Sequence, residues 1–390
     1  MLPVVSGTPL APAHVVPTAA IAQTTKAVLV AALLVALPAL FIAARGPRLS
    51  GREMVAPEAW SALEGRDAER AASLFQEALK ERPVDPVLHF GAGSAAFALG
   101  RTSQALASLR RAVELDPQFP EALAALGQVA YARGDTRLAI QSMEKASSLR
   151  PRDGDFTETL DRWRRESSVH SGYVERTAAH FKILYEGGTK QTVGDQVARV
   201  LEREYSRIGK TLNSFPAETL TVILYTNREF HDITRSPAWA TGNYDGRIRI
   251  AVGGELPAYE LDRVVTHELA HAIVASAAPR SLPTWLNEGL ATYLESADRG
   301  WAREVLRNAT TIVPLETLAH GFNGLDEQGA LVAYAESAVA AEILYAQLGS
   351  NIGAFLQVVG NGRSVDEALL EFQVQPNAFH SEWRRRVGLR

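Results

Sequence analysis

Apolar and polar residues follow three different patterns along the 390 residues of this chain. An apolar run without a charge comes first, at 27–44. Apolar positions at helical spacing then fill about 55–154, where the same pattern returns at a fixed interval. From residue 175 onward, short β-rich runs are mixed with longer helical ones. The patterning therefore predicts an apolar N-terminal segment, an all-α repeat region and an α+β domain over 175–390.

Strands and helices of the last part can be placed from the period of their apolar residues. Three runs predict strands: His180–Tyr185, Leu220–Tyr225 and Arg247–Val252. A helix that contains Arg199 is expected between the first two runs. Two further helices are expected at Leu261–Ser276 and Ser281–Glu295, because their apolar residues recur at helical spacing.

The N-terminal segment has the composition of a membrane anchor. Residues 1–26 lack helical periodicity and are expected to be a disordered tail. The apolar run 27–44 lies between Lys26 and Arg45, and its length is at the lower end of the roughly 17–25 residues that span a bilayer. No small-x-small cleavage site follows Phe41. We therefore interpret 27–44 as an uncleaved single-pass anchor, in preference to a cleaved signal peptide or a buried core helix.

Three columns of residues repeat with a period of 34, since 117−83 and 151−117 are both 34. The columns are Pro83, Pro117, Pro151; Ala71, Ala105, Ala139; and Ala78, Ala112, Ala146. This period, with small residues where two helices cross and a proline after the second helix, resembles the tetratricopeptide repeat. The resemblance implies about three helical hairpins over 55–154, which stack and leave a concave groove.

The repeats have two interpretations. Their groove is a site for a peptide or partner protein in one, and the array is a spacer between membrane and C-terminal domain in the other. Residues 155–174, which contain the charged stretch Asp161–Arg165, are expected to form a linker helix between the repeats and the domain at 175–390.

Composition narrows the chemistry that is available. The 40 Lys and Arg residues against 44 Asp and Glu give a net charge of −4, so no global basic field favours nucleic acid as a partner. The absence of cysteine excludes disulfides, thiolate zinc sites, iron–sulfur clusters and cysteine nucleophiles. Any bound metal must therefore be held by histidines and carboxylates.

One helical segment carries a metal-binding pattern. His267, Glu268 and His271 form an H-E-x-x-H motif, in which two imidazoles four residues apart lie on one face of a helix. Glu288, in the next expected helix, supplies a third ligand. Two histidines and a glutamate match a catalytic zinc site, whose fourth position stays open for water, whereas a structural site would have a closed shell. We expect one zinc ion per chain.

HELAH followed by WLNEGLA resembles the gluzincin metallopeptidases, which include thermolysin-like enzymes, and most closely the compact peptidase MA-like domains. The resemblance implies an α+β gluzincin fold after the all-α repeats. It also implies zinc ligands at His267, His271 and Glu288, and a general base at Glu268. The strand at Arg247–Val252 resembles the edge strand along which an extended peptide substrate pairs in that fold.

Several supporting residues follow from the same resemblance. Tyr334, and less directly Tyr293 or His320, would stabilise the oxyanion, with a packed helix tyrosine as the alternative for Tyr334. In thermolysin-like members an aspartate four residues after the glutamate ligand orients a histidine. Here that position is Thr292, and Glu295, about two turns from Glu288, is the candidate replacement.

The sequence thus predicts a membrane-anchored zinc peptidase that hydrolyses peptide bonds with a zinc-activated water. A repeat scaffold with a decayed peptidase fold is the alternative, although all three ligands and the base are present. Arg45, Arg48 and Arg52 outnumber Lys26, which favours a cytoplasmic domain. The single leading anchor and the habit of the family instead favour an extracytoplasmic catalytic domain, which is the expectation we retain.

Overall fold

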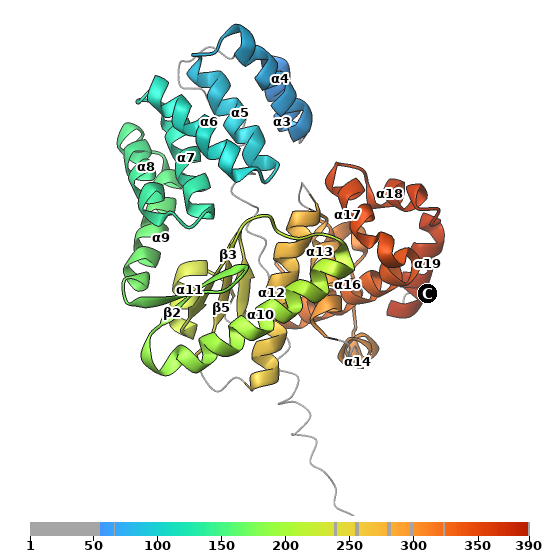
Figure 1. Ribbon diagram of the computed structural model, residues 1–390. Coiled ribbons are helices and arrows are strands. Elements are labelled where there is room, and N and C mark those ends of the chain that lie inside the picture. The colour runs from blue at the N-terminus through green and yellow to red at the C-terminus, as the bar shows by residue number, and fades with distance from the viewer. Residues whose placement is uncertain are drawn as a thin grey trace, which may run out of the picture.

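The computed structural model describes residues 55–388, apart from 66, 238–239, 254–256, 279–281, 297–299 and 323. Figure 1 shows a stack of helices that leads into a mixed sheet, with a second group of helices at the C-terminal end. The predicted order of an all-α array followed by an α+β domain is confirmed. The segment 27–44, predicted as a membrane anchor, lies outside the described residues, as does the tail at 1–26.

The array consists of three helical hairpins. Their helices are α3 (Pro57–Glu64), α4 (Ala68–Glu81), α5 (Pro86–Ala98), α6 (Thr102–Leu115), α7 (Pro120–Ala132) and α8 (Thr136–Leu149). The alanines of the repeat columns at 71, 105 and 139 are fully buried where helices cross. Pro83, Pro117 and Pro151 each follow the end of a second helix by two residues, as the period predicts.

Helix α9 (Gly154–His170) belongs to both parts of the protein. Its first half packs against the third hairpin through Phe156, Leu160 and Trp163. At its other end, Val169 packs on the hydrophobic cluster that includes Ile223 of the sheet. The segment predicted as a linker helix therefore packs on the array and on the sheet at once.

The sheet has five strands in the order β1-β2-β3-β5-β4. Their bounds are β1 (Tyr173–Thr177), β2 (Phe181–Glu186), β3 (Leu220–Tyr225), β4 (Gly242–Tyr244) and β5 (Ile248–Ala251). Strands β2, β3 and β5 run parallel, whereas β1 and β4 are antiparallel to their neighbours. The three predicted strands are present, each within one residue of its expected bounds.

One expectation about the sheet is wrong. The strand near Arg247–Val252 is not at the edge, because β5 pairs with β3 on one side and with β4 on the other. The edge strand is β4, which has only three residues and therefore too little periodicity to be recognised.

Helices cover both faces of the sheet (Figure 1). On one face lie α10 (Gln191–Leu212), which contains Arg199, and α12 (Ala258–Ala277), and they share a large core with Ile183, Val222 and Ile248. On the other face, α11 (Asn227–Thr234) and the end of α9 pack against Ile223 and Tyr225. Successive side chains of each strand thus point to opposite faces of the sheet and belong to two separate cores.

The remaining helices follow α12 in the chain. They are α13 (Thr284–Glu295), α14 (Gly300–Asn308), α15 (Leu315–Leu318), α16 (Glu327–Leu348), α17 (Ile352–Gly360), α18 (Val365–Glu371) and α19 (Pro376–Val387). Of these, α13 and α17 pack directly on α12. Among the described residues, one stretch, Glu327–Gly360, is long and apolar enough to cross a membrane. Because 78% of its apolar window is buried inside the protein, we interpret it as core.

Candidate metal centre

Helix α12 carries the H-E-x-x-H motif on a turn that is buried from every side. His267, Glu268 and His271 are each at most 2% exposed, between the sheet and α13. The flanking residues Val264, Leu269 and Ile273 bury the helix in the main core and so hold the imidazoles in place. The two imidazole rings lie with their centroids 4.7 Å apart and nearly perpendicular, close enough for both to bind one ion.

Helix α13 brings Glu288 to the same point. Its carboxylate is fully buried, and Gly289 beside it faces the backbone of α16, where a Cβ would collide with the carbonyl oxygen of Ser337. The glycine in the N-E-G sequence therefore permits the close approach of α13 to α16 that aims Glu288 at α12.

The three predicted ligands come together. The Oε2 atom of Glu288 lies 3.5 Å from Nε2 of His267 and 3.5 Å from Nε2 of His271. Donor atoms of all three residues lie within 4.8 Å of one another. Both Nε2 atoms and both carboxylate oxygens of Glu288 are buried without a hydrogen-bond partner. Buried polar groups are rarely left unpaired, so four such atoms around one point call for a ligand.

The donor set fits zinc. Two imidazole nitrogens and one carboxylate oxygen on two adjacent helices match a three-ligand catalytic site in both number and kind. The orphaned atoms point to the same conclusion, because a divalent cation would satisfy all of them at once. No thiolate is needed, which agrees with a chain that lacks cysteine.

Glu295 occupies the position expected of the supporting carboxylate. Its Oε2 lies 2.7 Å from Nδ1 of His267, on the opposite side of the ring from Glu288. Arg263 donates from Nη1 to Oε1 of Glu295 at 3.0 Å, and the same guanidinium pairs with Glu260. Such a carboxylate fixes the tautomer and orientation of a metal-binding imidazole. Thr292, at the alternative position, is buried with its hydroxyl unpartnered.

Sequence reasoning missed Arg263, although a signal for it was present. It lies one turn before His267, and Glu260 lies one turn before Arg263, which gives three charged residues on one face of the expected helix. Such a row is more often a solvated helix face. Only the burial of α12 in the structure shows that Arg263 holds Glu295 against the imidazole of His267.

Glu268 lies beside the edge strand. Both its carboxylate oxygens are buried without a hydrogen-bond partner. Gly242 of β4 packs against this side chain so closely that a Cβ would lie 2.8 Å from its Cδ and collide with Oε1. Gly242 was not predicted as a site residue, and its three-residue strand carries no pattern that would identify it.

The electrostatics of the cluster follow from burial and close opposite charges. Burial, with the nearby carboxylates of Glu288 and Glu295, raises the pKa of Glu268 well above its usual range, against the opposing effect of His267. Burial acts to lower the pKa of His267, but Glu288 and Glu295 outweigh it and raise the value to about 10. Burial acts to raise the pKa of Glu288, and the two imidazoles outweigh it and lower that value.

The three candidate oxyanion residues lie in different surroundings. The Tyr334 ring on α16 is buried beside His267, with the two ring centroids 6.4 Å apart. Tyr293 instead packs on Tyr345, with ring centroids 4.9 Å apart. His320 is exposed just after α15. Tyr334 is therefore the one whose ring the structure places beside a predicted ligand.

Comparisons with known proteins agree with this architecture. Residues 216–387 match the Peptidase MA superfamily, and residues 57–118 and 90–155 match the tetratricopeptide repeat. These matches confirm both resemblances and the fold class that they imply. No curated protein matches the chain.

Two solved structures are similar to part of the chain: the first TPR of Spaghetti (RPAP3) bound to the HSP90 peptide SRMEEVD, and an NMR structure of the first TPR domain of the human RPAP3 protein. Each is 19% identical with a TM-score of 0.28, and each match covers 29% of this chain. The matches cover 90% and 89% of those two chains, respectively.

Proposed function

Because the chain carries a Peptidase MA superfamily domain behind tetratricopeptide repeats, we propose that it is a zinc-dependent peptidase. The observation that carries the proposal is the buried cluster of His267, His271 and Glu288, whose donor atoms lie within 4.8 Å of one another. Nε2 of both histidines and both carboxylate oxygens of Glu288 lack any hydrogen-bond partner, which is the arrangement a zinc ion would complete.

The side chains around this cluster have distinct proposed roles. When bound, zinc supplies a Lewis acid for the scissile carbonyl and brings the pKa of water close to neutrality. Glu268 would accept a proton from the attacking water and return it to the leaving amine, because its carboxylate lies next to the proposed ligand His267 on the same helix. Tyr334 is the proposed donor to the developing oxyanion.

Strand β4 is the proposed track for the substrate backbone. It ends the strand order, so its outer side carries no strand in the described part of the chain. Gly242 places this strand directly against Glu268. An extended peptide that paired with β4 would therefore pass the general base, and backbone pairing of this kind binds peptides with little dependence on their sequence.

The test is cleavage of a peptide library by the full-length protein. We expect the wild type to bind one zinc and to cleave peptides, and Glu268→Gln to keep the zinc while losing hydrolysis by about 100-fold or more. Glu260→Gln is the matched control, since it also removes a buried carboxylate of α12 but one that pairs with Arg263.

The outcomes separate the proposal from its rival. Undiminished cleavage by Glu268→Gln would contradict the mechanism. A wild type that binds zinc and peptides but hydrolyses none of the library would support the scaffold alternative, in which the peptidase fold serves as a binding module.

Membrane attachment through 27–44, an extracytoplasmic catalytic domain and a protein partner in the repeat groove are further parts of the proposal. The uncharged apolar run supports the first. A reporter fused after Arg390 should be active outside the cytoplasm, and activity on the cytoplasmic side would reverse the orientation. A Glu268→Gln variant should retain bound substrates for identification.

A further inference from the structure

A cluster of buried polar side chains joins the third repeat to the sheet. We call it the junction cluster, and it consists of Tyr131 from α7, Glu166 from α9, Tyr225 from β3, and Arg247 and Arg249 at β5. The two arginine side chains are only 2% exposed and Glu166 is 0% exposed. Charged groups are almost never buried to this extent unless they are paired. The pairing of these side chains therefore ties the repeat array to the sheet.

Both arginines donate hydrogen bonds to Tyr131 of the array. The Nε atom of Arg247 donates to the carbonyl oxygen of Tyr131 at 3.0 Å, and its guanidinium carbon lies 3.8 Å from the centre of the Tyr131 ring. Arg249 donates from Nη2 to the Tyr131 hydroxyl at 2.7 Å. Hydrogen bonds and a cation–π contact therefore hold β5 to the last turn of α7.

Glu166 supplies the negative charge at the centre of the cluster. Its Oε1 lies 3.3 Å from Nη2 of Arg249 and accepts from the Tyr225 hydroxyl at 2.9 Å, and its Oε2 accepts from the Tyr131 hydroxyl. Asp245 also pairs with Arg249. Two arginines thus face two carboxylates, and the contacts of Glu166 link α7, α9, β3 and β5.

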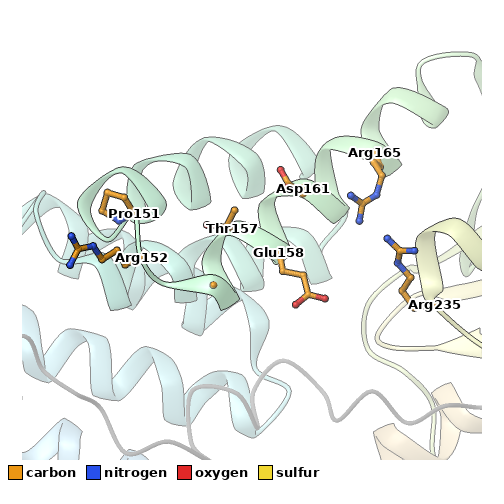
Figure 2. A pocket seen from close by; sticks show the side chains of 8 residues that line it. Pro151, Arg152, Thr157, Glu158, Asp161, Arg165 and Arg235 are labelled. Carbon is orange, nitrogen blue, oxygen red and sulfur yellow. The ribbon is translucent and has the colours of Figure 1, made fainter.

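The outer rim of the same junction is exposed to solvent, and there Arg133 of the array pairs with Glu218 of the domain at 3.3 Å. A solvent-open hollow of about 440 Å³ lies between α9 and the end of α11. In Figure 2 the exposed Arg165 and Arg235, which line this hollow, point toward each other. Like charges in this arrangement repel each other weakly in water. Exposed ion pairs contribute little to stability, so the buried contacts carry most of the attachment.

The junction cluster is connected to the proposed general base through strands β5 and β4, because β5 pairs with β4 and Gly242 of β4 contacts Glu268. Arg249 is directly opposite Asn243 in the antiparallel pairing of β5 with β4, and Gly242 is opposite Ile250. Side chains of Ile248 and Ile250 enter the core beneath α12, while Arg247 and Arg249 enter the junction. The β4–β5 hairpin is therefore held on one face by α12 and on the other by the repeats.

We propose that the junction cluster makes the repeat array part of the substrate site: Glu166, Arg247 and Arg249 are positioning residues that hold the edge strand β4 in register beside Glu268. The array is then neither a spacer nor an independently moving adaptor. The fit of an extended substrate along β4 depends on how the third repeat is docked. The catalytic consequence rests on the proposed peptidase function, whereas the mechanical coupling does not.

The mechanical part is tested by hydrogen exchange on the full-length protein. In Glu166→Gln, which leaves both guanidinium groups without their central carboxylate, amides of residues 242–251 should exchange about tenfold faster, with the amides of α12 unchanged. Tyr131→Phe removes one hydroxyl and should give a smaller increase in the exchange rate of the same amides. It is the second test variant, in case Glu166→Gln does not fold. Phe75→Leu is the control, because it disturbs the core of the first repeat, away from the hairpin.

The catalytic part is tested by comparing peptide lengths. Glu166→Gln should raise KM about tenfold for a long extended peptide and leave kcat/KM unchanged for a dipeptide analogue too short to pair with β4. Unchanged exchange at 242–251 in both junction variants, or an equal increase in Phe75→Leu, would overturn the coupling. If the wild type cleaves no peptide, the proposed function fails while the exchange data still decide the coupling. Equal changes in KM for both substrates would overturn the positioning role.

Discussion

At the scale of single residues, the proposed metal site of His267, His271 and Glu288 depends on how His267 is held. Its ring has a carboxylate on each side: Glu288 beside Nε2 and Glu295 beside Nδ1. Glu295 is itself fixed by Arg263, so that a buried row of alternating charges ends at the imidazole. Glu295 comes from the same helix as the proposed third ligand, Glu288, seven residues farther along.

Replacing Glu295 with glutamine should weaken zinc binding about 10- to 100-fold, because the amide orients and polarises the imidazole less well than a carboxylate. Competition with a chromophoric chelator measures this affinity. The control is Glu260→Gln, which removes the other carboxylate on Arg263 without touching the imidazole. Equal affinities of Glu295→Gln and the wild type would show that this hydrogen bond has no part in metal binding.

Residues that act through a local pattern could be predicted from the sequence. His267, Glu268 and His271 follow from helical spacing, and Glu288 and Glu295 follow from the position of the next helix. Arg249 and Glu166 could not be recognised, because a charged residue in a strand or helix is normally solvated. Their burial results from the docking of the array on the sheet, which no local pattern encodes.

At the scale of elements, strand β4 and helix α12 approach each other through a glycine. Gly242 lets the backbone of β4 lie against Glu268, and this contact joins the proposed substrate strand to the proposed base. The longer strands β2, β3 and β5 could be predicted from their apolar residues. Strand β4 could not, since three residues hold no period and its edge position depends on pairing with β5.

Gly242→Ala should reduce peptide hydrolysis about 10- to 100-fold and leave the zinc content at one per chain. The added Cβ would displace the Glu268 carboxylate, and small misplacements of a catalytic group have effects of this size. Gly154→Ala is the matched control, because a Cβ there meets nothing within 4 Å. Full activity of Gly242→Ala would argue against Glu268 as the base.

Helix α16 contains a buried carboxyl group outside the metal-binding cluster. Glu336 is fully buried, with Oε1 accepting from the Val313 N–H at 2.7 Å and Oε2 unpartnered. Burial raises the pKa of Glu336 from about 4.5 to about 7, although the bond from Val313 opposes this effect. The folded state therefore binds the proton more tightly than the unfolded chain, and stability must fall as the pH rises from about 4.5 through 7.

Glu336→Gln should remove this loss, because a neutral amide keeps the acceptor for Val313 without a charge. Relative to the wild type, the variant should gain several degrees in Tm at pH 8 and show almost no gain at pH 3.5, where the carboxyl group is protonated in both the folded and the unfolded chain. Thermal unfolding at both pH values measures the difference. A gain that is the same at both pH values would exclude ionisation of Glu336 as its cause.

At the scale of the whole molecule, the chain combines two architectures that share helix α9 and the junction cluster. The period of 34 was enough to predict the array, and the helical and β-rich runs were enough to predict the α+β domain. The attachment of one to the other was not predictable. It depends on Tyr131 and Arg249, which are 118 residues apart and meet only after both parts have folded.

The central claim is that His267, His271 and Glu288 form a zinc centre, and metal analysis combined with zinc X-ray absorption tests it most directly. For the purified full-length protein, we predict one zinc per chain, with two imidazole nitrogens and only nitrogen and oxygen neighbours at about 2.0–2.2 Å. His267→Ala and His271→Ala should each lose the metal. A wild type without stoichiometric zinc, or undiminished zinc in both alanine variants, would contradict the account.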